Sequence, residues 1–153
     1  MREMRRKDRM MTPEEAEQIL RNECYGILAT VGSDRTPYGV PLNYAYADGA
    51  LYFHCAPIGH KLDNIAQNSA ASFTVVASAQ VLPETFSTHF KSVIAFGNIF
   101  PVNGEEKKKG LIALIEKYSP DYMEEGLKCM EKTGEHTTVL KLEISGISGK
   151  DHE

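Results

Sequence analysis

The sequence predicts a mainly β or α+β fold, in which six antiparallel strands close into a small barrel with peripheral helices. Asp48-Gly49 lies between two aromatic strand segments and is a strong hairpin signal, because both residues tolerate positive φ. The predicted strands also lack the βαβ alternation of parallel sheets. With 153 residues the chain has the size of one domain, so residues 1–153 are expected to form a single domain.

The first part of the chain predicts one helix and three strands. Thr12-Pro13-Glu14-Glu15 predicts a helix start, since the Thr and Glu side chains cap free N–H groups and proline suits the first helical position. Tyr25–Val31 and Pro37–Tyr46 are the first two strands, and the third contains Leu51-Tyr52-Phe53. Pro41 cannot donate a ladder hydrogen bond, so it is expected at a sheet edge or a bulge.

The middle of the chain predicts a short helix and two further strands. Lys61–Asn68 forms the helix, and Ala71–Ala77 follows as a buried strand. Ser87-Thr88-His89 is expected in a loop before the long strand Ser92–Val102. Glycine inside a strand often marks a bend or a close approach of backbones, which is the role expected for Gly97.

The last third predicts two amphipathic helices and a final strand. Apolar residues at 111, 114, 115 and 118 place one buried stripe on the helix Glu105–Tyr118, and Tyr122–Lys132 repeats the pattern. Thr138–Ile147 alternates apolar and charged residues, as a half-buried strand does. A barrel of about six strands is filled by its own side chains, so a sizeable ligand must bind outside it or between two copies.

Composition excludes several classes of protein. The net charge of −4 and a pI near 5.8 argue against a nucleic-acid partner, and no apolar run approaches a membrane span. Three cysteines without CxxC spacing indicate reduced thiols, so the expected location is the cytoplasm. Residues 1–11 form a basic N-terminal arm, which is interpreted as a solvated tail or an arm between subunits.

Motifs with established chemistry are mostly absent. Gly149-Lys150 lacks the earlier glycine and the following Ser or Thr of a phosphate loop, and no GxGxxG occurs. His54 stands at a strand end and is a candidate ligand-facing or catalytic group, the alternatives being a histidine with satisfied hydrogen bonds and no ligand role, or a metal ligand. Metal is the least favoured role, since no HxH or HExxH spacing exists. Lys61 is the strongest candidate for binding a phosphate, because it opens a helix and helix N-termini attract anions.

In their order and spacing, seven short segments resemble the FMN-binding split barrels related to pyridoxamine 5'-phosphate oxidase, and among them the nitroimidazole-resistance (Nim-type) flavoproteins. The segments are Met4–Arg9, Gly26–Thr30, Pro37–Tyr44, Tyr52–His54, Gly59–Lys61, Ser92–Val93 and Ile147–Lys150. The resemblance covers nearly the whole chain, from about residue 4 to residue 150. It implies a homodimeric split barrel with FMN, or alternatively FAD, in a groove between the subunits.

The same resemblance implies which residues hold the flavin. Pro41, Leu42, Asn43 and Tyr44 would line the isoalloxazine ring, with His54, Lys61 and Ser92 at the phosphate end. Lys150 would reach the flavin from the last strand or from the partner subunit. The implied activity is an FMN-dependent oxidoreductase that reduces a small electron acceptor, such as the nitro group of a nitroimidazole. The alternatives are a non-enzymatic flavin or haem binding protein on the same scaffold, and an interaction module without a cofactor.

Overall fold

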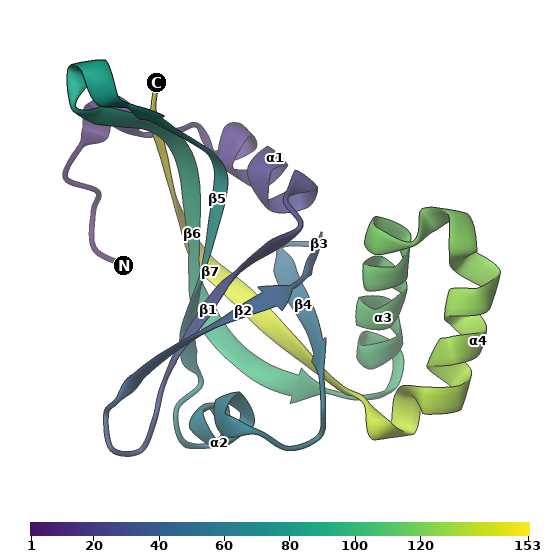
Figure 1. Cartoon of the computed structure of the whole chain (residues 1–153). Coiled ribbons are helices and arrows are strands. Elements are labelled where there is room, and N and C mark those ends of the chain that lie inside the picture. The colour runs from purple at the N-terminus through teal and green to yellow at the C-terminus, as the bar shows by residue number, and fades with distance from the viewer.

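The computed structural model describes residues 1–153 and shows a mainly antiparallel β fold with four α-helices (Figure 1). Seven strands form one sheet in the order β2-β1-β5-β6-β7-β4-β3. The strands are β1 (Tyr25–Val31), β2 (Pro37–Asn43), β3 (Ala45–Ala47), β4 (Ala50–Cys55), β5 (Ala70–Leu82), β6 (Ser87–Val102) and β7 (Thr138–His152). The helices are α1 (Pro13–Asn22), α2 (His60–Gln67), α3 (Gly104–Tyr118) and α4 (Met123–Thr133).

The predicted count of six strands is wrong, because the predicted strand Pro37–Tyr46 is divided at Tyr44 into β2 and β3. The break follows from a distant contact. The Tyr118 hydroxyl accepts a hydrogen bond from the Tyr44 N–H at 2.9 Å and lies 2.8 Å from the Tyr44 carbonyl oxygen. Because β2 and β3 are the two ends of the sheet and only Tyr44 separates them, the sheet must curl round on itself.

The β5–β6 hairpin is longer than expected, and the predicted loop at Ser87-Thr88-His89 is wrong. β5 continues to Leu82 and β6 begins at Ser87, where the two residues pair. The turn between them is a short 3-10 helix, Pro83–Thr85, and its C-cap residue Phe86 has a left-handed φ of 53°. Polar residues therefore continue the ladder and carry it away from the barrel body (Figure 1).

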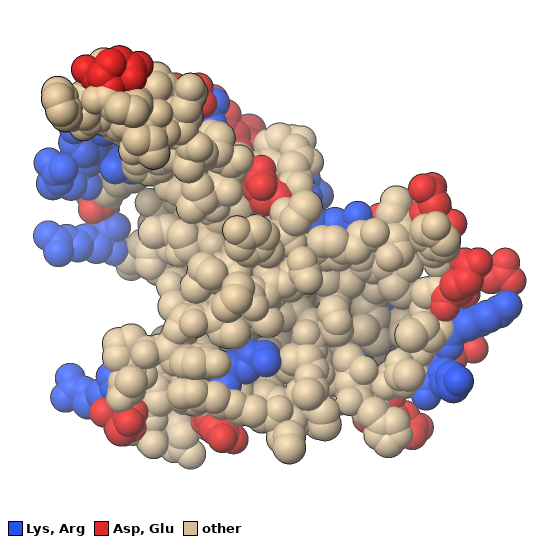
Figure 2. All heavy atoms as spheres, viewed as in Figure 1, with Lys and Arg blue, Asp and Glu red and all other residues tan.

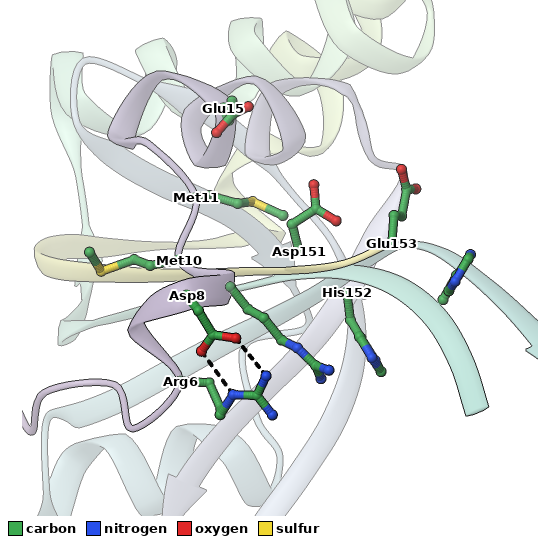
Figure 3. Close-up of a pocket in the computed structure, with 10 residues that line it drawn as sticks. Arg6, Asp8, Met10, Met11, Glu15, Asp151, His152 and Glu153 are labelled. Carbon is green, nitrogen blue, oxygen red and sulfur yellow. Dashed lines mark hydrogen bonds and ion pairs between the residues drawn. The ribbon is translucent and has the colours of Figure 1, made fainter. Parts of the chain in front are cut away.

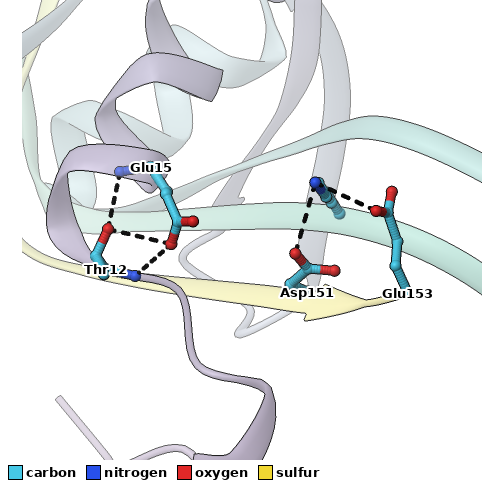
Figure 4. Close-up of polar contacts among 5 residues, drawn as sticks. Thr12, Glu15, Asp151 and Glu153 are labelled. Carbon is cyan, nitrogen blue, oxygen red and sulfur yellow. Dashed lines mark hydrogen bonds and ion pairs between the residues drawn. The ribbon is translucent and has the colours of Figure 1, made fainter.

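Other local predictions are confirmed. Thr12 caps α1 through a reciprocal capping box, in which the Glu15 N–H donates to Thr12 Oγ1 at 3.2 Å and Glu15 Oε2 accepts from the Thr12 N–H at 2.9 Å (Figure 4). Asp48 and Gly49 both have positive φ in the β3–β4 turn. Pro41 lies on β2, an edge strand of the sheet.

The hydrophobic core fills the space that the curled sheet encloses. Phe73 packs edge-on against Tyr44 and Phe53, with ring centroids 4.7 and 5.1 Å away, and all three side chains are fully buried. α3 packs against β3 and β4, while α2 is tied to β1 by a buried hydrogen bond from Asn64 Nδ2 to Thr30 Oγ1 at 3.1 Å. The interior is therefore occupied by side chains.

The basic N-terminal arm docks on the last strand. The Met11 N–H donates to the Gly149 carbonyl oxygen at 3.0 Å, and Met10 forms an isolated β-bridge with Lys150. Residues from the arm thus meet residues about 140 positions later in the sequence. Of the helices, none combines the length and the apolar character that crossing a membrane requires.

Candidate functional site

The first group of candidate residues lies at the start of α2. Gly59 is the N-cap residue and has no side chain to cap the helix, so the N–H groups of the first turn have no side-chain acceptor. The His60 ring lies 4.0 Å from the Tyr38 ring of β2, between ring centroids, which places this helix start beside the edge strand. Lys61 follows as the second residue of the helix, so the predicted helix start is displaced by one residue.

Lys61 is half-buried and makes no ion pair within the chain, whereas Lys91, Lys109 and Lys141 each pair with acids. Burial raises the pKa of the Cys55 thiol, and the Lys61 ammonium opposes this shift, which indicates that the two side chains are close. His54 is exposed at the end of β4. The start of α2 thus presents an ammonium, free N–H groups and the His60 ring, a combination suited to an anionic group.

A second group lies where β6 and β7 pair. Ser92 is the direct register partner of Lys150, and both are half-buried. Lys150 Nζ lies 5.0 Å from the centroid of the Phe90 ring, two residues from Ser92, and it has no carboxylate partner. This pair therefore offers a hydroxyl and an unpaired cation on one face of the sheet.

The structure does not bring these two groups together within one chain. His54 pairs with Val139 near the start of β7, whereas Ser92 pairs with Lys150 near its end. Eleven residues separate Val139 from Lys150, which corresponds to about 36 Å along an extended strand. The residues assigned to one flavin by resemblance are thus divided between the two ends of β7.

An exposed apolar surface lies on β1, β2 and β5, and of its residues only Pro41 is among the predicted site residues. Tyr25, Ile27 and Val76 are 62%, 40% and 53% exposed, although their neighbours Leu28, Phe73 and Val75 are fully buried. We call Tyr25, Ile27, Pro41 and Val76 the outer face. Figure 2 shows that the region over β1 and β2 carries few charged side chains. The signal was present in the sequence, because Tyr25–Val31 is apolar on both sides of the strand.

The register connects the outer face to the second group. Pro41 pairs with Ile27, Ile27 with Thr74, and Thr74 with Ile94, so one continuous row crosses four strands. Ile94 in turn pairs with Ser148, two residues before Lys150. A planar ligand lying on this row would have apolar side chains beneath it and the Ser92–Lys150 pair near one end.

Among the predicted ring-lining residues, Tyr44 is not exposed in the single chain. Its side chain is fully buried, with the Phe73 ring on one side and Lys117 Nζ 3.7 Å from its ring centroid, and burial raises the pKa of its hydroxyl above the usual range. The Tyr118 hydroxyl is the hydrogen-bond partner of both its backbone N–H and its carbonyl oxygen. Leu42 is half-buried against the core, so only Pro41 and Asn43 of this segment are exposed. Asn43 Nδ2 donates to the Cys24 carbonyl oxygen at 2.9 Å.

Several cavities of the single chain lie away from the candidate residues. Five of them have volumes of about 390 to 710 Å³, and none of these five is lined by Pro41, His54, Lys61, Ser92 or Lys150.

Known proteins share this architecture. A putative 5-nitroimidazole antibiotic resistance protein from Bacteroides thetaiotaomicron superimposes with a TM-score of 0.75 at 20% identity, covering 92% of this chain and 85% of that one. The conserved hypothetical protein Rv2991 from Mycobacterium tuberculosis superimposes with a TM-score of 0.84 at 19% identity, covering 99% of this chain and 91% of that one. The FAD and heme binding protein from Mycobacterium smegmatis superimposes with a TM-score of 0.81 at 22% identity, covering 93% of this chain and 72% of that one.

At these identities the structural likeness shows the fold. No curated protein matches the chain in sequence. The family model described as pyridoxamine 5'-phosphate oxidase matches residues 12–151, which spans every helix and nearly every strand described above. The resemblance drawn from the sequence segments is therefore confirmed, and the chain belongs to the pyridoxamine 5'-phosphate oxidase family of split barrels.

Proposed function

We propose that two copies of this chain bind FMN between them and use it to reduce a small electron acceptor, the nitro group of a nitroimidazole being the candidate substrate. The observation that carries the proposal is the outer face, an exposed apolar strip whose row of paired residues leads to the unpaired cation Lys150. Family membership and the fold shared with a putative nitroimidazole resistance protein support this choice of ligand and acceptor.

A second copy of the chain is the proposed cover for the outer face. Soluble proteins rarely leave a contiguous apolar patch of this kind exposed, and such a patch usually marks an interaction site. A two-fold dimer would also bring Ser92 and Lys150 of one copy near Lys61 of the other. This arrangement would join the two groups that a single chain holds apart. Size-exclusion chromatography with light scattering tests it, and a monomer at micromolar concentration would contradict it.

The residues fit the chemistry of FMN. A phosphate carries negative charge that the Lys61 ammonium and the free N–H groups at the start of α2 would neutralise. The isoalloxazine ring is flat and largely apolar, which suits contact with Ile27 and Pro41 on the outer face. A bound reduced flavin supplies two electrons, which with two protons convert a nitro group into a nitroso group and water.

The chain's own contribution is binding, orientation and exclusion of water. Apolar side chains on the outer face would keep one side of the ring dry, and the second copy would cover the other. His54 stays the candidate catalytic group, because it is an exposed imidazole at the end of β4 whose ring nitrogens can hold or donate a proton.

We expect the purified protein to be yellow and a Lys61→Ala variant to bind FMN about tenfold more weakly, since it removes a point charge from the phosphate. Riboflavin lacks the phosphate, so its affinity should change by less than about twofold. Quenching of flavin fluorescence measures both affinities. Lys132→Ala is the matched control, because Lys132 is exposed on α4. Equal weakening for FMN and riboflavin would contradict the assignment of Lys61 to the phosphate.

The redox activity has a direct test. The flavin-loaded protein is reduced anaerobically with dithionite and mixed with 2-nitroimidazole, and reoxidation of the flavin is followed by absorbance. Reoxidation that depends on the nitro compound supports a reductase. A flavin that stays reduced would favour the alternative, a carrier of flavin or haem. The FAD and heme binding protein with the same fold supports that alternative, and a Soret band in the purified protein would identify it.

A further inference from the structure

A polar pocket of about 560 Å³ lies where the N-terminal arm crosses the ends of β6 and β7 (Figure 3). The proposed function does not use it. Arg6 and Arg9 come from the arm, His89 from β6 and His152 from β7. The rings of His89 and His152 lie 6.3 Å apart between centroids. Four potential hydrogen-bond donors therefore gather from three segments that are remote in sequence.

The donors of this pocket differ in whether they already have partners. Arg6 is engaged, because Asp8 accepts two hydrogen bonds from its guanidinium at 2.8 and 2.5 Å. Arg9 is half-buried and has neither an ion pair nor a side-chain hydrogen bond within the chain. His89 and His152 contact each other and likewise bond to no acceptor. A half-buried guanidinium and two imidazoles are thus available to a ligand.

The acids that also border the pocket are directed elsewhere or already satisfied. Figure 3 shows His152 and Arg6 on one side of the end of β7, with Asp151, Glu153 and Glu15 on the other. Lys91 Nζ pairs with Asp151 at 3.5 Å and with Glu153 at 3.4 Å (Figure 4). Glu15 is held by the capping box of α1. On the side of His152 the one acid that lines the pocket is Asp8, and it is paired with Arg6 (Figure 3).

The side of β7 that carries His152 is electrostatically positive. Burial, and then the charges of Arg9, Lys150, His89 and Arg6, hold the pKa of His152 below its usual range. Neighbouring cations that oppose a proton on His152 would favour an anion in the same place. The histidines and acids of the chain form no group of three arranged to hold a metal ion.

We propose that Arg9, His89 and His152 form a second anion site, which binds a phosphate-type oxyanion. The donors approach from the arm, β6 and β7, and three directions suit a tetrahedral anion better than a planar carboxylate. The guanidinium fork of Arg9 provides two parallel N–H groups, the geometry that binds phosphate oxygens most strongly. Within one chain the pocket is remote from the Lys61 group, which lies beyond the opposite end of β7, and it adjoins the Ser92–Lys150 pair through the Phe90 ring, which contacts both His152 and Lys150.

Calorimetric titration of the full chain with inorganic phosphate, in phosphate-free buffer, tests this site. We expect Arg9→Gln and His152→Asn each to weaken phosphate binding about tenfold. Arg5→Gln is the matched control, because Arg5 is an exposed arginine of the same arm outside the pocket. It should change the affinity by less than about twofold, and so should Lys61→Ala. Circular dichroism of each variant verifies that it is folded.

The outcomes separate this site from the proposed flavin site. Loss of phosphate binding in Arg9→Gln and His152→Asn, with Lys61→Ala unchanged, supports the second site even if no flavin binds. Loss in Lys61→Ala alone would mean that phosphate occupies the flavin site and would overturn the proposal. An equal loss in Arg5→Gln, no binding by the native chain, or acetate binding as tightly as phosphate would overturn it as well.

Discussion

A Gly97→Ala variant is expected to lose at least about 3 kcal/mol of unfolding free energy. A Cβ atom at this position would lie 1.8 Å from the Glu143 carbonyl oxygen and 2.9 Å from its carbonyl carbon. Both neighbours are backbone atoms, so no side-chain rotation can make room. The close approach coincides with the irregularity between Phe96 and Gly97, where β6 changes its register with β7. Separating the strands there would disturb the longest ladder of the sheet.

Urea unfolding followed by circular dichroism measures this loss. Native and variant chains must be compared at one protein concentration, because association would add to the stability of both. Gly134→Ala provides the control, since a Cβ there meets no atom within 4 Å and the residue has right-handed helical φ and ψ. Its effect should remain within about 1 kcal/mol. Unchanged stability of Gly97→Ala would show that the strands can separate without cost.

A Tyr118→Phe variant is expected to lose about 2 to 3 kcal/mol, since it removes the only side-chain partner of the backbone at the β2–β3 break. The hydroxyl accepts from the Tyr44 N–H at 2.9 Å and lies within hydrogen-bond distance of the Tyr44 and Cys24 carbonyl oxygens, at 2.8 and 2.5 Å. One proton serves only one carbonyl at a time. Without the oxygen, the amide of a fully buried residue loses its acceptor.

The same unfolding measurement tests this variant, with Tyr122→Phe as the control. Tyr122 is 64% exposed and its hydroxyl makes no hydrogen bond within the chain, so its loss should cost less than about 0.5 kcal/mol. Burial also raises the pKa of Tyr118, which keeps the hydroxyl protonated at neutral pH. Equal stabilities of the two variants would show that Tyr118 is not required to hold the break.

The sequence predicts best those features that arise from neighbouring residues. Thr12 with Glu15, Asp48-Gly49 and the alternation of Thr138–Ile147 depend on local geometry, and the structure confirms each. The break at Tyr44 depends on a hydroxyl 74 residues away, so no local pattern marks it. The polar residues of Ser87–His89 predict a loop. The structure has a strand there, because this segment pairs with β5.

The candidate site likewise has features that follow from neighbouring residues and features that depend on distant contacts. The position of Lys61 at a helix start follows from its own segment, and the structure places it there within one residue. The burial of Tyr44 depends on packing against Phe73 and Lys117, which periodicity alone does not determine. Arg9 and His152 line one pocket although almost the whole chain separates them in sequence. No local pattern in the basic arm therefore predicts that the two residues are close.

The prolines of β2 have a consequence for how the protein behaves when crowded. An unpaired edge strand offers its free amides to any other chain and can seed ordered aggregates. Pro37 and Pro41 are spaced by four residues, so their nitrogens point to the same side of β2, and neither can donate a hydrogen bond. A strand of another chain that aligned with β2 would lack the hydrogen bonds from positions 37 and 41. The edge is thus protected against fibril-like stacking by residues that leave its seven-pair ladder with β1 intact.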